Sequence, residues 1–156
     1  MKKKLSLLIV ITVIFALCSC GKTNSTKKIE DIDGLALKLS QELEFDDEIE
    51  LSDDEFTLSK YGIDTSKIND VARYAGSGAT ADEIAVFKCA DSDCVEEVQN
   101  AVKSRIEYLY DGYSDYDPAE VPKINSSVIL INGDVIVFVI CKNADKAEEI
   151  VNGFLV

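Results

Sequence analysis

The side chains most capable of chemistry in this sequence are cysteines and closely spaced carboxylates, because histidine is absent from all 156 residues. Without histidine the chain lacks the commonest general base and metal ligand, and no Ser-His or Cys-His nucleophile pair can form. It also contains no glycine-rich phosphate loop, no metalloprotease motif and no Cys-x-x-Cys pair. We therefore expect a non-enzymatic function, with no catalytic residue, no cofactor and no bound metal.

Three cysteines, Cys89, Cys94 and Cys141, lie in the second half of the chain. Cys94 is predicted in the first turn of a helix, where the helix dipole favours a reactive thiolate, and Cys89 is a candidate partner for it. The acidic residues around Cys94 disfavour that thiolate. One disulfide with a free thiol, or three buried thiols, would both fit. A structural role is favoured over a redox role.

Carboxylates are concentrated in residues 111–117, which include Asp111, Asp115 and Asp117. Calcium favours oxygen-rich loops, but this segment lacks the glycine and the closing glutamate of an EF-hand. A second acidic run, at residues 46–55, is typical of a solvated surface. We favour solvated acidic loops at both places, and calcium binding is the alternative.

Four tyrosines surround the same segment: Tyr108, Tyr110, Tyr113 and Tyr116. Tyrosine is favoured at binding surfaces because its ring provides contact area while its hydroxyl stays hydrated. We expect Tyr110, Tyr113 and Tyr116, in a loop over residues 108–118, to contact a partner. The alternative is that Tyr110 and one neighbour close a helix end over the core.

The N-terminus predicts export and lipidation. Three lysines precede an apolar run over residues 5–17, and the tetrapeptide Leu17-Cys18-Ser19-Cys20 resembles a bacterial lipobox. That resemblance implies cleavage before Cys20 and a diacylglycerol on its sulfur. The run is shorter than the roughly 20 apolar residues that span a bilayer, whereas two acyl chains anchor a protein stably. A signal peptide without lipidation, or a short membrane anchor, is the alternative.

These features predict three segments: a signal peptide at residues 1–19, a flexible polar tether at 20–28, and one domain at 29–156. The domain would stand on the extracytoplasmic face of the cell membrane, held in the lipid bilayer by the Cys20 diacylglycerol. Without the three signal lysines, 13 basic residues face 29 acidic ones, a formal charge of −16. Such a charge repels nucleic acid, and leaves basic peptides, cations or an envelope protein as partners. Solubility alone is the alternative explanation.

The hydrophobic pattern predicts the elements that must position these residues. Apolar residues recur at helical spacing over 32–43 and from Ser92 to about Tyr110. A short helix is expected between them, with Ser52 and Glu55 as a capping box and an end at Gly62. Residues 70–76 and 82–89 are predicted to form one hairpin.

The strongest local signal is the pair Asn132-Gly133 between the apolar runs 128–131 and 135–141. This pattern predicts a second hairpin with a two-residue turn. Neither run alternates with polar residues, so the hairpin should be covered on both faces. Asn143 is expected to cap a final helix. The fold class is therefore α+β: a four-stranded, mainly antiparallel sheet from two hairpin-plus-helix units, preceded by N-terminal helices.

The two units match each other weakly. Residues 82–104 and 134–156 share identities that include Cys89 with Cys141 and Ile84 with Ile136, at a constant offset of 52. A duplication would relate the two units by a pseudo-two-fold axis, and a coincidence of similar patterns is equally compatible with these identities.

Residues 81–88, Ala-Asp-Glu-Ile-Ala-Val-Phe-Lys, and the helix that follows them resemble a family of Gram-positive bacterial lipoproteins, domain-of-unknown-function family 4358. The Tyr116-Asp117-Pro118 segment and the hairpin at Asn132-Gly133 are similar too, so the resemblance covers about 60–156. It implies an envelope location and this fold, and no activity.

Taken together, these features predict a membrane-anchored extracytoplasmic lipoprotein that binds a protein or peptide without catalysis. The alternatives are a small-ligand or calcium-binding accessory to an envelope transporter and a thiol-redox protein.

Overall fold

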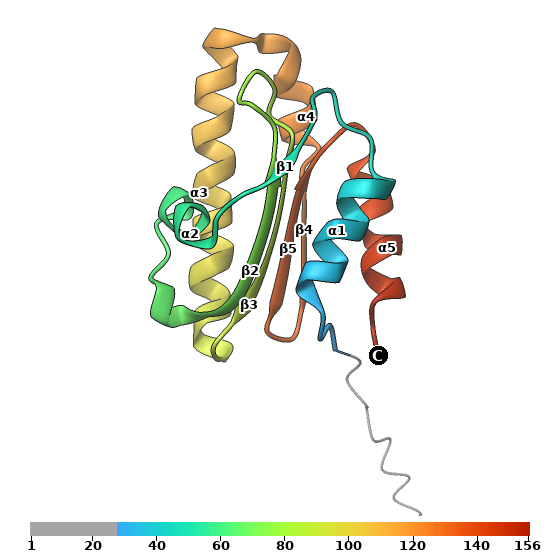
Figure 1. The fold of residues 1–156 in the computed structure, drawn as a ribbon. Helices are drawn as coiled ribbons and strands as arrows, with labels where there is room; N and C mark the ends of the chain where they lie inside the picture. Colours follow the sequence, from blue (N-terminus) through green and yellow to red (C-terminus); the bar gives the residue numbers. More distant parts are fainter. Residues whose placement is uncertain (1–27) are drawn as a thin grey trace, which may run out of the picture.

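The computed structural model describes residues 28–156, and its centre is a five-stranded sheet in which every neighbouring pair is antiparallel (Figure 1). The strand order is β1-β2-β3-β5-β4. The strands are β1 (Glu50–Leu51), β2 (Ile68–Ala75), β3 (Glu83–Cys89), β4 (Val128–Asn132) and β5 (Val135–Ile140). The α+β class and both predicted hairpins, β2–β3 and β4–β5, are confirmed.

The fifth strand corrects the predicted count of four. Glu50 and Leu51 lie in the acidic stretch and pair with Ala75 and Tyr74 of β2. Two exposed residues are too few to produce a periodic pattern, so the sequence carried no signal for β1.

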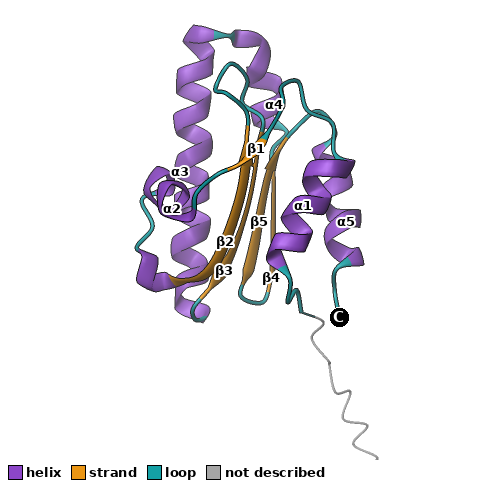
Figure 2. Cartoon of the chain, in the orientation of Figure 1, coloured by secondary structure: helices purple, strands orange, loops and turns teal. Residues whose placement is uncertain are grey.

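Helices cover both faces of the sheet (Figure 2). One face carries α1 (Ile32–Glu42) and α5 (Ala147–Gly153), and the other carries α2 (Asp54–Tyr61) and α3 (Ser92–Tyr116). The remaining pieces are α4 (Val121–Asn125) and three single turns of 3₁₀ helix at Thr65–Lys67, Pro118–Glu120 and Ala144–Lys146. No helix among the described residues is both long enough and apolar enough to span a membrane.

The two central strands explain why the sheet needs two helix layers. All six residues of β5 are buried. Val135, Val137 and Val139 pack in the core beneath α1 and α5. Their neighbours Ile136 and Phe138 point the other way, into the core beneath α2 and α3. The prediction that the second hairpin is covered on both faces is confirmed for β5, and β4 is the half-buried edge strand.

The helix α3 is longer than predicted, and this changes the candidate site. Residues 111–116 continue the helix instead of forming a loop, so the predicted loop at 108–118 is wrong. Leu109 and Tyr113, four residues apart, are both buried and extend the apolar stripe of α3. The helix stops at Asp117 because Pro118 follows, and residues before proline avoid the helical conformation.

Three predicted turn and cap details are also corrected. Asp53 rather than Ser52 caps α2, accepting a hydrogen bond from the Phe56 amide at 3.0 Å, while the end of α2 at Gly62 is confirmed by its φ of 65°. The hairpin turn residues are Gly133 and Asp134, one position later than predicted. Asn143 makes no cap, because its side-chain oxygen accepts from the Glu44 amide instead.

The two-fold relation that a duplication would give does not hold in the structure. In the register of β3 with β5, Ile84 lies opposite Val139, and directly paired residues share a face of the sheet. Ile136 is three residues before Val139, so Ile84 and Ile136 face opposite sides. The helices that follow the two hairpins also lie on opposite faces of the sheet, α3 on one and α5 on the other. The expected signal peptide, the tether to residue 27 and Cys20 lie outside the described residues.

Candidate functional site

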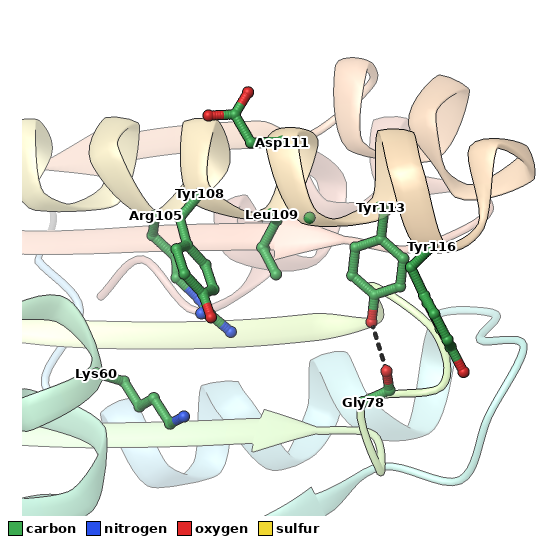
Figure 3. Close-up of a pocket in the computed structure, with 9 residues that line it drawn as sticks. Lys60, Gly78, Arg105, Tyr108, Leu109, Asp111, Tyr113 and Tyr116 are labelled. Atoms are coloured by element: carbon green, nitrogen blue, oxygen red, sulfur yellow. Dashed lines mark hydrogen bonds between the residues drawn. The ribbon is translucent and has the colours of Figure 1, made fainter.

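A groove between α3, α2 and the β2–β3 loop gathers most of the tyrosines singled out in the sequence (Figure 3). It encloses about 450 Å³, and we call it the tyrosine groove. It is lined by Lys60, Gly78, Arg105, Tyr108, Leu109, Asp111, Gly112, Tyr113 and Tyr116. All but Lys60 of α2 and Gly78 of the β2–β3 loop come from α3. An adjoining hollow of about 280 Å³ between α2 and α3 shares Lys60, Arg105 and Tyr108 with it.

Tyr113 is the fixed end of the tyrosine groove. Its ring is buried, and its hydroxyl donates to the carbonyl oxygens of Gly78, at 2.9 Å, and Thr80. These bonds tie α3 to the β2–β3 loop, where Gly78 has a φ of 96° that favours glycine. Burial raises the pKa of Tyr113 above its ordinary value, so this hydroxyl stays protonated. It therefore shapes the groove rather than offering a reactive group.

The other tyrosines divide between the groove and the opposite surface. Tyr108 and Tyr116 line the groove and are 69% and 71% exposed, so their rings are available to a partner. The ring of Tyr116 lies edge-on to Tyr113, with centroids 6.1 Å apart. Tyr110 is 43% exposed but does not line the groove. Of the three predicted contact residues, the structure thus brings Tyr113 and Tyr116 together and leaves Tyr110 apart.

A buried carboxylate lies beneath the groove, and we call its surroundings the Glu83 cluster. Glu83 Oε1 accepts from Arg73 Nε and from the Tyr61 hydroxyl, both at 2.7 Å. Glu83 Oε2 accepts from Arg105 Nη2 at 2.8 Å and from its Nε at 3.2 Å. Arg73 also donates to Ser52 Oγ at 2.8 Å. The cluster therefore joins α2, α3, β2, β3 and the residue that precedes the N-cap of α2.

The charges of this cluster are set by their partners. Burial alone would raise the pKa of Glu83, but the hydrogen bonds and charges of Arg73 and Arg105 hold it below its ordinary value. Burial and the adjacent carboxylate raise the pKa of Tyr61 well above its ordinary value. Glu83 is therefore ionised and Tyr61 is neutral, and neither is a proton donor or acceptor for chemistry near neutral pH.

A second charged cluster lies at the start of the same strand, and we call it the Lys123 cluster. Lys123 Nζ lies 2.8 Å from Asp82 Oδ1, 2.8 Å from Glu120 Oε2 and 2.9 Å from Asp46 Oδ2. The ammonium is the sole partner of Asp82 Oδ1 among the described residues.

Backbone groups complete the Lys123 cluster. Asp82 Oδ2 accepts from the amides of Asp46 and Asp47 and from the Thr80 hydroxyl, and Glu120 Oε2 accepts from the Ala81 amide. Although burial lowers the pKa of Lys123, its three carboxylate partners raise it above the ordinary value. The cluster fastens the α1–β1 loop and α4 to the end of the sheet, and it opens onto none of the hollows described above.

The three cysteines are buried free thiols. Cys89 and Cys94 belong to the core under α2 and α3, and Cys141 to the core under α1 and α5. The Cys94 thiol donates to the Lys67 carbonyl at 2.9 Å. Burial raises the pKa of Cys89 above its ordinary value and that of Cys141 to about 11, so both thiols are protonated and unreactive near neutral pH.

The predicted acidic loops take other roles in the structure. Asp111 and Asp115 are on a helix, so the oxygen-rich loop on which the calcium alternative depended does not exist. Asp46 pairs with Lys142 as well as Lys123, and Asp47 accepts from Ser77. Among residues 28–156, no three potential ligands from His, Cys, Asp or Glu come together as a metal site.

Sequence reasoning missed Glu83, Arg73 and Arg105. The available signal was the pair Asp82-Glu83 at the start of a strand that is otherwise almost wholly apolar. A carboxylate in a buried strand requires a partner, because an unpaired buried charge is very costly. Which cations provide it could not be read from the sequence, since Arg73 and Arg105 come from two other elements.

The comparisons with known proteins place the chain in a family without supplying an activity. No curated protein and no solved structure matches it, so neither a relative nor a structural neighbour adds a ligand or a partner. The family model for a domain of unknown function, DUF4358, matches residues 41–141, which run from the end of α1 to just past β5 and include the whole tyrosine groove and both charged clusters. The chain belongs to the DUF4358 family.

Proposed function

We propose that this protein is a lipid-anchored extracytoplasmic binding domain that recognises a protein or peptide partner through the tyrosine groove, without catalysis. The observation that carries the proposal is the pair of exposed rings, Tyr108 and Tyr116, beside a cavity of about 450 Å³. Exposed aromatic side chains around a concave site are characteristic of binding surfaces.

The surroundings of the groove support binding rather than reaction. Its walls are held by the buried Tyr113 hydroxyl and by the Glu83 cluster, which make it a largely pre-formed site. The groups that line it are tyrosine hydroxyls, two cations and one carboxylate, Asp111, and the chain offers no histidine to act beside them. Pre-formed surfaces bind with less loss of conformational entropy.

Position-specific crosslinking tests the groove. Replacing Tyr108 or Tyr116 with a photo-crosslinking phenylalanine in the full-length protein, expressed at its native level, should give one dominant crosslinked partner. Tyr110 is the matched control, because it lies on the same helix and outside the groove. Tyr108→Ala with Tyr116→Ala should abolish partner capture, while Tyr110→Ala should leave it intact. Equal capture from all three positions would contradict the assignment.

The anchor is tested separately. Cys20→Ser should remove labelling of the protein by a fatty-acid probe, since a thioether-linked diacylglycerol requires the Cys20 sulfur. Cys141→Ser, a change at a buried thiol, is the control and should leave the labelling unchanged. Continued fatty-acid labelling of Cys20→Ser would refute lipid anchoring at this residue.

A further inference from the structure

We propose that the tyrosine groove selects a partner segment that presents a carboxylate beside an apolar or aromatic side chain. The inference rests on the proposed function and specifies the chemistry of the partner. The charge of the groove is opposite in sign to that of the protein as a whole.

The Glu83 cluster has more positive than negative charge. One carboxylate, Glu83, is enclosed by two guanidinium groups, those of Arg73 and Arg105. The side chains of these residues are 2%, 7% and 10% exposed, so solvent screens the remaining positive charge weakly. No other carboxylate within salt-bridge distance of either arginine is found among the described residues.

Arg105 directs that charge toward the groove. Its Nε and Nη2 are engaged by Glu83, whereas its Nη1 makes no hydrogen bond within residues 28–156. The guanidinium lies over the Tyr108 ring, 5.4 Å from its centroid, so it is held between a buried anion and an exposed aromatic surface. Figure 3 shows the Arg105 and Tyr108 side chains lying together along the groove. A pre-positioned guanidinium with a free N–H is suited to a carboxylate oxygen.

Lys60 adds a second cation from the opposite wall. Its ammonium lies 5.1 Å from the centre of the Phe56 ring and forms no ion pair among the described residues. In Figure 3 its side chain points from α2 into the space beneath Tyr108 and Arg105. Asp111 is the only acidic residue that lines the groove. Two cations against one carboxylate is the reverse of the whole chain, where 29 acidic residues exceed 16 basic ones.

The apolar part of the ligand follows from the remaining walls. Tyr108, Leu109 and Tyr116 provide ring faces and an aliphatic surface next to the two cations. A carboxylate alone would leave these surfaces hydrated, while an apolar side chain beside it would bury them. Electrostatic complementarity would also select against basic segments, which the acidic remainder of the protein would otherwise attract.

The probe is 3-phenylpropionate, which carries a carboxylate next to a phenyl ring, and the readout is heteronuclear NMR. Residues 21–156, which contain every strand of the sheet and both helix layers, are titrated with 3-phenylpropionate and with the uncharged 3-phenylpropionamide. We expect saturable shifts of the Arg105 Nε–H signal and the Gly112 amide with the carboxylate. The amide should bind about tenfold more weakly, because it lacks a charge-assisted hydrogen bond.

Lys60→Gln is the test variant, since Lys60 is exposed and supports no other described charge. It should weaken 3-phenylpropionate binding severalfold and leave the amide unaffected. Lys103→Gln, an exposed change on α3 away from the groove, is the control. Equal binding of carboxylate and amide, an unchanged Lys60→Gln variant, or shifts outside the groove would overturn the inference.

The two proposals fail in distinguishable ways. Loss of carboxylate preference together with intact crosslinking at Tyr108 and Tyr116 would overturn the charge selection and leave the groove as a binding surface. Carboxylate preference without any position-specific crosslink would leave a small-molecule site and refute the protein-binding function.

Discussion

Asp82 and Glu83 are neighbours in the chain, and both are buried carboxylates, yet they build charged clusters of opposite balance. Asp82 shares one ammonium, that of Lys123, with two other carboxylates. Among the described residues, Glu83 is the single carboxylate that pairs with two guanidinium groups, and it also accepts a hydrogen bond from the Tyr61 hydroxyl. The two clusters therefore differ in which charge is left in excess. The Lys123 cluster is closed by backbone amides and ties loops to the sheet, whereas the Glu83 cluster leaves a cation facing the tyrosine groove.

The largest expected effect comes from removing the single cation of the Lys123 cluster. Lys123→Met leaves Asp82 and Glu120 buried with no counter-ion, so we expect a loss of about 3–5 kcal/mol in the free energy of unfolding. Urea unfolding of residues 21–156 measures it. Lys103→Met, an exposed position on α3, should change stability by less than about 0.5 kcal/mol. Similar values for the two variants would show that the Lys123 cluster is not a structural fastening.

The next effect comes from the anion of the Glu83 cluster. Glu83→Gln keeps the size of the side chain but leaves Arg73 and Arg105 without a buried counter-charge, and we expect a loss of about 3 kcal/mol. Because the amide oxygen of a glutamine side chain can still accept hydrogen bonds from the two arginines, the cost should fall below that of Lys123→Met. Glu107→Gln, at an exposed site of α3, is the control in the same unfolding experiment. A larger loss than for Lys123→Met would reverse the comparison between the clusters.

The lowered pKa of Glu83 predicts a specific loss of stability in acid. Since Arg73 and Arg105 hold this pKa below its ordinary value of 4.5, the ionised carboxylate stabilises the fold above that value. The contribution disappears as the pH falls from 4.5 through the lower folded-state pKa. The free energy of unfolding of the native protein should therefore decrease more steeply below pH 4.5 than that of Glu83→Gln. The same dependence of the free energy of unfolding on pH below 4.5 in both proteins would contradict the assignment of Glu83 as ionised.

The smallest effect is expected at the groove wall where Tyr113 of α3 contacts the β2–β3 loop. Tyr113→Phe removes the hydroxyl that donates to the Gly78 and Thr80 carbonyls, and we expect a loss of about 1 kcal/mol. Local hydrogen exchange in the β2–β3 loop should rise with it. Tyr110→Phe, where the lost hydroxyl has no described hydrogen bond, should leave both measurements unchanged.

Most of the fold was predictable because it depends on local pattern. Apolar spacing located α1 and α3, and the uninterrupted apolar residues of β5 predicted a strand buried on both faces. The errors come from places where a nonlocal contact decides. Ser52 was expected to cap α2, but its hydroxyl accepts from Arg73, and Asn143 was expected to cap a helix but holds the Glu44 amide.

The candidate site was predictable only in part, for the same reason. The tyrosine-rich segment lies at the groove, and Tyr113 continues the apolar spacing of α3, so its helical form could have been predicted. The contact of the Tyr113 hydroxyl with the β2–β3 loop could not, because it joins two separate elements. The cationic side of the groove depends on Glu83 meeting residues from β2 and α3. Charge composition alone suggested attraction to basic partners, whereas the local arrangement at Lys60 and Arg105 favours an acidic one.

The two ends of the described residues lie side by side, since Lys28 and Val156 exchange two backbone hydrogen bonds of 3.1 Å. Figure 1 shows both ends at one pole of the molecule, while α3 runs toward the opposite pole and finishes there at Tyr116. The domain therefore has a base and a tip. A support attached through the N-terminal side would therefore place the end of α3, with Tyr116 of the tyrosine groove, at the pole farthest from that support. A reporter fused after Val156 would sit at the base, where it leaves the tip unobstructed.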